Sequence, residues 1–353
     1  MANEEAQIGV LLLNLGTPDS PAVGDVRRFL RQFLSDRRVI RLPQPLHWLL
    51  LNLLILPFRP RKSAAAYRAI WTEAGSPLLH FGRGLAESVA ERLGLGFRVE
   101  LAMRYGSPSI AESLSTLMAS DLAKIVVVPL FPQYAIASTG SALAEVARVL
   151  ESAERPPPLH TLGDFFEHPS FINAYTEVAE PILKDFAPDH VVFSFHGLPE
   201  WQIRELDPSG RRCLVDADCC AASSAENRSC YRAHCFATTR ALVAALEVDM
   251  DLNEHNTSLV FQSRMGRTPW LDPDLVNVLP ELAERGIKRL AVFCPAFVAD
   301  CLETVEEIGI RARAQWSELG GDALCLIPCV NAGPGWADGV AAMVRETAAS
   351  ADR

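Results

Sequence analysis

The sequence predicts an α/β protein of two doubly wound domains, each built on a parallel sheet and facing a common cleft. Short apolar runs with strand character alternate with stretches of helical periodicity along most of the chain, and this alternation is typical of βαβ units. The 353 residues can supply two cores and are too many for most single domains. A proline-rich joint at 154–160 interrupts the periodicity, so we divide the chain into domains 1–158 and 159–353.

The apolar runs give the expected strands, and the stretches between them give the expected helices. In the first domain, strands are expected at 8–15, 97–105 and 124–134, and helices from residue 24 and near 81–93, 109–120 and 138–152. In the second domain, strands are expected at 190–196, 257–263, 288–295 and 323–328, and helices near 170–186, 231–247, 272–285 and 302–318. A last helix over 335–349 closes the chain and can pack back on the first domain.

The charge balance and the first residues bound the class of protein. The net charge of −10 leaves no basic stripe to neutralise phosphates, so we expect no nucleic-acid partner. The chain starts with acidic and polar residues and shows no charged and then apolar leader. We therefore expect a cytoplasmic protein. The sequence is compatible with a monomer and with a homodimer.

The most apolar stretch lies at 46–58 and is too short to span a bilayer. It contains Trp48 and is followed by Arg59, Arg61 and Lys62. An apolar helix beside basic residues and a tryptophan can dip into a membrane interface. A buried core helix has the same pattern, so both interpretations stand.

His196, Asp300 and Glu303 outline a proton-handling site. The run HVVFSFH at 190–196 reads as a strand buried on both faces, so His196 lies at its carboxyl end. Asp300 and Glu303 follow the strand at 288–295, and their spacing of three puts both carboxylates on one face of a helix starting near Asp300. A histidine and two acids at one sheet edge can exchange protons. The alternatives are a turn histidine at 196 and a helix N-cap at 300.

Polar and aromatic residues gather at the carboxyl ends of strands in both halves. They are Asn14, Leu15, Gly16 and Thr17; Arg104 and Tyr105; Pro132, Gln133 and Tyr134; His196; Gln262 and Ser263; and Asp300 and Glu303. Such edges bind ligands in open α/β sheets. A cleft lined in this way suits a large, flat and partly apolar ligand.

Five separated motifs resemble the ferrochelatase family, whose members insert ferrous iron into a porphyrin. They are LLNLGTPDSP at 12–21, PQYAIASTGSAL at 132–143, FSFHGLPE at 193–200, QSRMGRTPWLDP at 262–273 and FCPAFVADCLE at 293–303. The resemblance covers nearly the whole chain. It implies the chelatase fold, two flavodoxin-like Rossmann-type domains, and insertion of Fe2+ into protoporphyrin IX to give protohaem with release of two pyrrole protons.

The resemblance also implies roles for single residues. His196 and Glu303 would share iron binding and proton transfer, with Asp300 beside them. Leu15, Arg104, Tyr105, Tyr134 and Trp270 would line the porphyrin pocket, and Ser263 at its strand end completes the expected substrate-binding set. The family often has a histidine where this chain has Cys301. The segment 46–58 matches the family's membrane-facing lip, which favours peripheral contact with the inner membrane.

A cysteine-rich insert at 209–235 is absent from most family members. Five of the nine cysteines fall within 23 residues: Cys213, Cys219, Cys220, Cys230 and Cys235. Zinc sites usually show paired C-x2-C knuckles, and none occurs here. Because some ferrochelatases carry a [2Fe–2S] cluster on four thiolates, the resemblance favours that cluster over zinc. We expect Cys213, Cys220, Cys230 and Cys235 as ligands, with Cys219 as the substitute.

Four rival functions differ in substrate or in class. Related chelatases use cobalt or nickel, or coproporphyrin III, but coproporphyrin-type members usually have a tyrosine near the position of Leu15. A non-catalytic iron–sulfur sensor on the same fold has no need of His196 facing Glu303. A two-domain solute-binding protein would need an export leader. Protoporphyrin IX and Fe2+ are therefore the expected substrates.

Overall fold

The computed structural model describes residues 7–215, 218–247, 250–266 and 268–350, so Asp216 and Ala217 of the cysteine-rich insert lie outside the described residues. The chain forms two compact units. The first takes in the stretches up to Phe131, from Ile136 to Gly163 and from Ala332 onward, and the second takes in Pro132–Ala135 and Asp164–Asn331.

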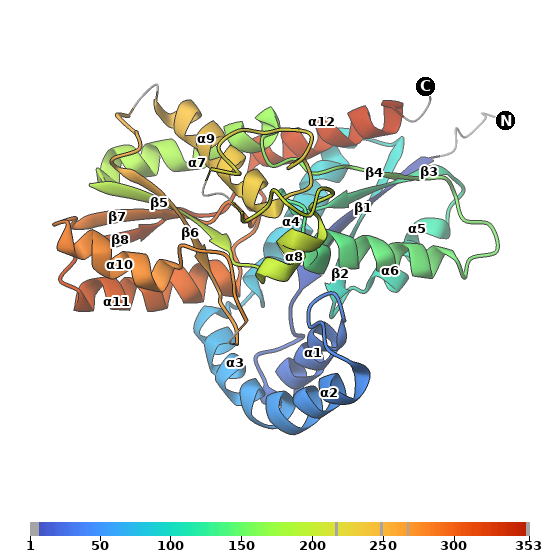
Figure 1. Ribbon diagram of the computed structural model, residues 1–353. Coiled ribbons are helices and arrows are strands. Elements are labelled where there is room, and N and C mark those ends of the chain that lie inside the picture. Colours follow the sequence, from blue (N-terminus) through green and yellow to red (C-terminus); the bar gives the residue numbers. More distant parts are fainter. Residues whose placement is uncertain (1–6, 216–217, 248–249, 267, 351–353) are drawn as a thin grey trace. The chain divides into compact units, whose positions relative to one another are not determined.

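The first unit is a doubly wound parallel sheet (Figure 1). Its strand order is β2 (Phe97–Tyr105), β1 (Gln7–Gly16), β3 (Leu122–Pro129) and β4 (Leu159–Thr161). Leu11 and Leu13 of β1 pack toward α5 (Ile110–Met118) and α6 (Ser141–Leu150). The opposite face of the sheet is covered by α4 (Pro77–Leu93) and α12 (Pro334–Ser350). Burial on both faces explains the unbroken apolar run of the central strand.

The last helix, α12, belongs to the first unit. Trp336, Val340 and Val344 are buried at helical spacing, and α12 packs against α4 and β3. Sequence patterns divide the chain only once, near residue 158, whereas the structure places residues 332 onward with the first unit. Packing of an apolar helix face on a distant part of the chain leaves no local boundary signal.

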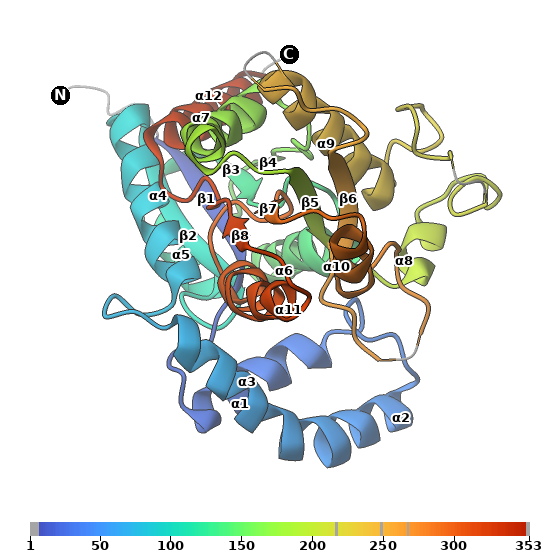
Figure 2. The same cartoon turned by 90° about the vertical axis from the view of Figure 1, so that its left-hand side faces the viewer.

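The second unit repeats the architecture (Figure 2). Its parallel strands follow the order β6 (Thr257–Gln262), β5 (His190–His196), β7 (Arg289–Phe293) and β8 (Ala323–Leu326). One face packs on α10 (Leu275–Glu284), the π-helix η3 (Leu302–Ala312) and α11 (Arg313–Glu318). On the other face, Tyr175 of α7 (Pro169–Phe186) contacts Phe293, and α7 packs against α9 (Tyr231–Glu247). Both sheets have the flavodoxin-type order, which confirms the predicted fold class of two doubly wound parallel sheets.

A helical segment that contains 46–58, here called the apolar lip, extends the first unit (Figure 1). The helices α2 (Gln44–Leu49), η1 (Leu50–Ile55) and α3 (Leu56–Ile70) follow one another without a break, and α3 packs against α1 (Val23–Ser35). Leu34, Leu51 and Leu56 form a small buried cluster, while Leu54 and Phe58 are 62% and 73% exposed. Among the described residues, no helix combines the length and apolar character needed to cross a membrane.

Two short elements, the strand β4 and the helix α8 (Glu200–Glu205), have no signal in the sequence patterns. Each has six residues or fewer, which is too short to display a hydrophobic period. The helix expected over 138–152 begins with the π-helical turn η2 (Ile136–Gly140) and continues as α6. The helix expected over 302–318 is present, but its first 11 residues are π-helical. Such π-helical segments often occur at functional sites.

Candidate active site

His196 is the last residue of β5, and its ring is fixed in one tautomer. The Nδ1 atom lies 2.6 Å from the carbonyl oxygen of Gly197. A carbonyl oxygen can only accept a hydrogen bond, so Nδ1 carries the hydrogen, and in the neutral ring the lone pair is on Nε2. The side chain is half-buried, and within the described part of the chain nothing bonds to Nε2. His196 therefore presents a proton acceptor at the carboxyl edge of the second sheet.

Gln262 ties this edge to the π-helix η3. It pairs with His196 in the register of β5 and β6 and is only 2% exposed. Its Oε1 accepts from Ser194 Oγ at 2.7 Å, and its Nε2 donates to the carbonyl oxygen of Glu303 at 2.7 Å. The side chain of Gln262 thus holds the first turn of η3 beside the strand that carries His196. The sequence places Gln262 at a strand end but does not reveal this link.

Glu303 lies in the first turn of η3 and is half-buried. Its neighbour Cys301 is the N-cap, and the Cys301 thiol also hydrogen-bonds with the Glu303 carboxylate. Burial, reinforced by the negative charge of Glu303, raises the pKa of the Cys301 thiol well above its ordinary value. Cys301 is therefore a neutral donor to Glu303. At this position, where the resembled family often has a histidine, the chain provides a hydrogen-bond donor that carries no positive charge.

The helix at Glu303 starts at Leu302, the first residue of the expected range 302–318, and this places Asp300 before it. Because Cys301 is the N-cap and η3 starts at Leu302, Asp300 lies outside the helix, and the predicted common face for Asp300 and Glu303 is wrong. The Asp300 carboxylate instead accepts from Asn331 Nδ2 at 2.8 Å, Thr304 Oγ1 at 3.1 Å and Cys329 N at 3.3 Å. Asp300 is 9% exposed and holds the chain around η3 in place.

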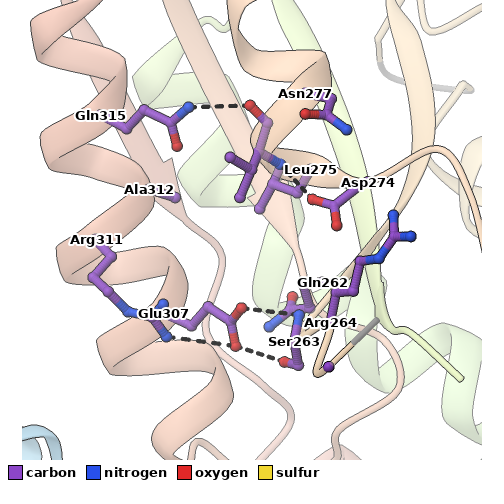
Figure 3. A pocket seen from close by; sticks show the side chains of 12 residues that line it. Gln262, Ser263, Arg264, Asp274, Leu275, Asn277, Glu307, Arg311, Ala312 and Gln315 are labelled. Atoms are coloured by element: carbon purple, nitrogen blue, oxygen red, sulfur yellow. Dashed lines mark hydrogen bonds and ion pairs between the residues drawn. The ribbon is translucent and has the colours of Figure 1, made fainter. Parts of the chain in front are cut away.

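Ser263 and Glu307 form the floor of a cavity of about 570 Å³ beside η3 (Figure 3). Ser263 has a left-handed backbone with φ of 66°, which turns the chain sharply after β6. Its N and Oγ atoms donate to the two Glu307 carboxylate oxygens at 2.9 and 2.5 Å. The Arg311 guanidinium lies 3.8 Å from the same carboxylate. In this structure the Ser263 hydroxyl therefore already donates its hydrogen to Glu307.

Trp270 packs against the turn that follows His196. A Cβ atom at Gly197 would lie 2.9 Å from the Gln262 carbonyl oxygen and 3.3 Å from the Trp270 ring. A side chain would not fit there, so the position requires glycine. Trp270 is only 7% exposed, and its Nε1 donates to Thr268 Oγ1 at 3.2 Å. Trp270 therefore packs on Gly197, the residue that follows His196.

Arg104 and Tyr105 end β2 of the first unit and share a buried carboxylate, Asp36. Arg104 Nη2 and Tyr105 Oη donate to Asp36 Oδ2 at 2.9 and 3.0 Å. Ser141 Oγ donates to the same oxygen at 2.5 Å and accepts from Arg104 Nε at 2.7 Å. Burial alone would raise the pKa of Asp36, but these hydrogen bonds and the charge of Arg104 outweigh it and hold the pKa below its ordinary value.

The predicted substrate-binding residues form two sets, one in each unit. Leu15, Arg104 and Tyr105 belong to the first unit, whereas Tyr134, Ser263 and Trp270 belong to the second with His196 and Glu303. Leu15 is half-buried at the end of β1. Tyr134 is half-buried, and its backbone N–H donates to His234 Nδ1 at 3.4 Å. Asp36 was not predicted, because nothing in the pattern around 36 distinguishes it from other loop acids.

Five cysteines of the insert, here called the cysteine site, are all buried. They are Cys213, Cys219, Cys220, Cys230 and Cys235, each 6% exposed or less. The sulfur atoms of Cys219 and Cys220 are 3.7 Å apart. Hydrogen bonding with Cys230 and burial raise the pKa of Cys220, and burial raises the pKa of Cys213. The thiols of Cys213 and Cys220 are thus neutral without a metal.

Two polar side chains organise the loop around the cysteine site. The Asp207 carboxylate accepts from the backbone N–H groups of Arg212 and Cys213, both at 2.9 Å. Arg232 Nη1 donates to Cys220 Sγ at 3.2 Å. Across the residues that the structure describes, no three His, Cys, Asp or Glu side chains converge on a single metal position.

The fold defines a class, the α/β proteins of the chelatase fold. Bacillus subtilis SirB, solved with Fe3+, shares the fold with a TM-score of 0.52 and 14% identity over 98% of this chain and 97% of that chain. At this identity the likeness concerns the fold alone.

Sequence comparison places the chain within that class. The ferrochelatase family profile matches residues 7–348. A ferrochelatase of Coxiella burnetii strain Dugway 5J108-111 is 46% identical over 97% of this chain and 94% of its own length. A ferrochelatase of Legionella pneumophila strain Lens is 43% identical over 96% of this chain and 98% of its own length. The chain belongs to the ferrochelatase family and is a metal chelatase.

Proposed function

We propose that the protein inserts Fe2+ into protoporphyrin IX and forms protohaem, with release of two pyrrole protons. The family membership and the ferrochelatase relatives support this activity. The observation that carries the mechanism is the tautomer of His196, because its Nδ1–H is held by Gly197 and its Nε2 lone pair is available. A cobalt or coproporphyrin III chelatase and a non-catalytic sensor are not favoured.

In the proposed mechanism, His196 and Glu303 act as a pair on the pyrrole nitrogens and the incoming iron. Each pyrrole N–H must give up its proton before the metal binds all four nitrogens. His196 Nε2 takes a proton and becomes an imidazolium, whose charge the Glu303 carboxylate stabilises. Imidazole and carboxylate are both ligands that ferrous iron accepts, so the same pair can hold the metal as it leaves water. Asp300 contributes by positioning η3 through Thr304.

We assign the porphyrin contacts to the predicted substrate-binding residues, which are Leu15, Arg104, Tyr105, Tyr134, Ser263 and Trp270. The guanidinium of Arg104 is already bonded to Asp36 and Ser141. We therefore expect Arg104 to contribute a positive charge at a fixed position and not to move in order to bind a porphyrin propionate. The Ser263 hydroxyl, bonded to Glu307, would have to exchange that partner to contact a substrate.

The test is an anaerobic assay of Fe2+ and protoporphyrin IX that follows haem absorbance. His196→Ala should lower kcat by about 10²- to 10⁴-fold, the usual contribution of a general base. His255→Ala is the matched control, because the His255 side chain is 87% exposed and lies outside the site. An active His196→Ala enzyme, or a folded wild-type protein that makes no haem, would contradict the proposal. Parallel reactions with coproporphyrin III and with Co2+ decide between the chelatase substrates.

We further propose that the cysteine site holds a [2Fe–2S] cluster on Cys213, Cys220, Cys230 and Cys235, with Cys219 as the substitute ligand. Five buried thiols in one loop fit a soft metal centre. A two-iron cluster distributes four thiolates over two metal ions, so the thiols need not converge on one position. When bound, the cluster supplies one-electron redox chemistry, and no step of iron insertion passes through it. Visible absorption bands and an iron-to-sulfide ratio of one test this assignment against zinc.

The apolar lip is proposed to contact an anionic membrane surface on the cytoplasmic side of the inner membrane. Trp48, Leu54 and Phe58 are more than half exposed, and the exposed residues Arg59, Arg61 and Lys62 follow them. Apolar side chains beside cations match an anionic interface.

Vesicle flotation tests the lip with and without anionic lipid. Leu54→Ser with Phe58→Ser should reduce binding to anionic vesicles. Leu95→Ser should not, because Leu95 is 94% exposed but lies outside the lip. Equal flotation of all three proteins would refute membrane contact through the lip.

A further inference from the structure

Tyr231 makes a direct hydrogen bond to the main chain of His196. It is the first residue of α9 and is 4% exposed. Its hydroxyl donates to the His196 carbonyl oxygen at 2.8 Å. His196 is also held by its strand pairing with Gln262, and the residues after Gly197 are bonded to the segment 269–271. The Tyr231 hydroxyl adds a side-chain bond to the His196 carbonyl itself.

The same tyrosine lies inside the cysteine site. Cys230 precedes it and accepts the first helical hydrogen bond of α9, from His234 N at 3.0 Å. Cys235 follows four residues later, so its side chain lies on the same helix face as Tyr231. The Tyr231 hydroxyl and the Cys235 sulfur are hydrogen-bonding neighbours. Because sulfur is a weak acceptor, the hydroxyl hydrogen remains with the His196 carbonyl.

A second contact shows that α9 braces more than one part of the site. His234 Nε2 lies 2.6 Å from the Arg228 carbonyl oxygen, so Nε2 carries the hydrogen and Nδ1 is the acceptor. That acceptor receives the backbone N–H of Tyr134. Burial lowers the pKa of His234, which keeps the ring neutral and this acceptor in place. The start of α9, between Cys230 and Cys235, therefore carries the contacts to two site segments.

We propose that Tyr231 is a positioning residue for His196, and that through it the occupancy of the cysteine site controls how firmly His196 is held. This coupling rests on the proposed cluster. The first turn of a helix lacks internal partners for its N–H groups and frays easily. Ligation of the Cys230 and Cys235 thiolates would fix that turn on both sides of Tyr231. An empty site would leave the turn free to fray and the bond to His196 weaker.

The first arm of the test uses Tyr231→Phe, which keeps the buried ring and removes only the hydroxyl. We expect kcat for iron insertion to fall about five- to tenfold, the worth of one hydrogen bond, with KM for the porphyrin unchanged. The imidazole NMR signal that is missing in His196→Ala should shift in Tyr231→Phe. Thr239→Val is the control, because its hydroxyl bonds only the Cys235 carbonyl oxygen within α9. An unchanged kcat and an unshifted signal would overturn the positioning role.

The second arm tests the coupling with Cys213→Ser, which removes a proposed ligand that lies outside α9. If the cysteine site acts through Tyr231, Cys213→Ser should lower kcat in the wild-type background and have little further effect in Tyr231→Phe. Equal fold-losses in both backgrounds would overturn the coupling. Cys220→Ser repeats this arm if Cys213→Ser does not fold. A colourless wild-type protein would refute both the cluster and the coupling, while the first arm still decides the positioning role.

Discussion

The carboxyl edges of the two sheets use their polar residues in opposite ways. In the first unit, Arg104, Tyr105 and Ser141 all direct their polar groups to the Asp36 carboxylate. In the second unit, His196 uses one ring nitrogen for a structural bond and presents the other. Glu303 is anchored there by its backbone carbonyl, which accepts from Gln262, while its carboxylate has the weak thiol donor Cys301.

This difference indicates that the first edge is rigid and that the second edge is reactive. A closed network of buried polar groups is fully satisfied and specifies one rigid arrangement. It has no group left to exchange a proton. An edge whose reactive groups are held through backbone atoms keeps its geometry while the side chains remain available. We therefore expect substitutions at the first edge to act mainly on stability, and substitutions at the second edge to act mainly on kcat.

The largest expected effect is that of Glu303→Gln on the rate. The amide keeps the volume and loses the charge that stabilises the imidazolium of His196, so kcat should fall by about 10²- to 10³-fold. Thermal stability should hardly change, because the Glu303 side chain contributes only a hydrogen bond with Cys301. Glu180→Gln is the control, since that carboxylate pairs with Lys184 on the surface of α7, outside the site. A large loss of stability with an unchanged rate would reverse the assignment of the two edges.

Much of the second edge could be predicted from the sequence because its signals are local. The strand of β5 and the helix of α9 have the predicted bounds, 190–196 and 231–247. Each is a strongly apolar or periodic run that stops at a clear break. The placement of Asp300 on the helix face of Glu303 was wrong, because the pattern does not show that Cys301, rather than Asp300, is the N-cap.

The first edge could be predicted only in part because its bonds join distant residues. Arg104 and Tyr105 follow a recognisable strand, but their common partner Asp36 lies 68 positions before Arg104. No local period relates the two. The same reason hides the role of Gln262, whose partner Glu303 is 41 positions away. Tertiary pairing of polar side chains is decided by the fold and leaves little trace in the pattern of a single sequence.

Asp36→Asn should produce the largest loss of stability at the first edge. The Asp36 and Arg104 side chains are 6% and 17% exposed, and removing one partner leaves the other charge buried and unpaired. Such losses cost about 3 kcal/mol of unfolding free energy, which urea unfolding at pH 7 can measure. Glu180→Gln breaks the exposed pair with Lys184 and should cost less than about 1 kcal/mol. Equal losses for both variants would show that the Asp36 network is not a special source of stability.

The smallest predicted effect is a difference in acid sensitivity between the two units. Burial, helped by the charge of Arg285, lowers the pKa of His190 in the second unit from 6.5 to about 4. Between these values the unfolded chain binds a proton that the folded unit excludes, so stability falls as the pH drops from 6.5 toward 4. At pH 5 this costs about 2 kcal/mol relative to pH 7.

The first unit should respond to acid in a lower pH range. The pKa of Asp36 is held below its ordinary value of 3.8, so its contribution is complete above 3.8 and is lost only as the pH falls through its lower folded value. Hydrogen exchange followed by peptide from pH 7 to 4.5 should therefore show the second unit opening first. His190→Gln should remove this slope and His255→Gln should not. If the second unit opens no earlier than the first, His190 is not the group that sets its acid sensitivity.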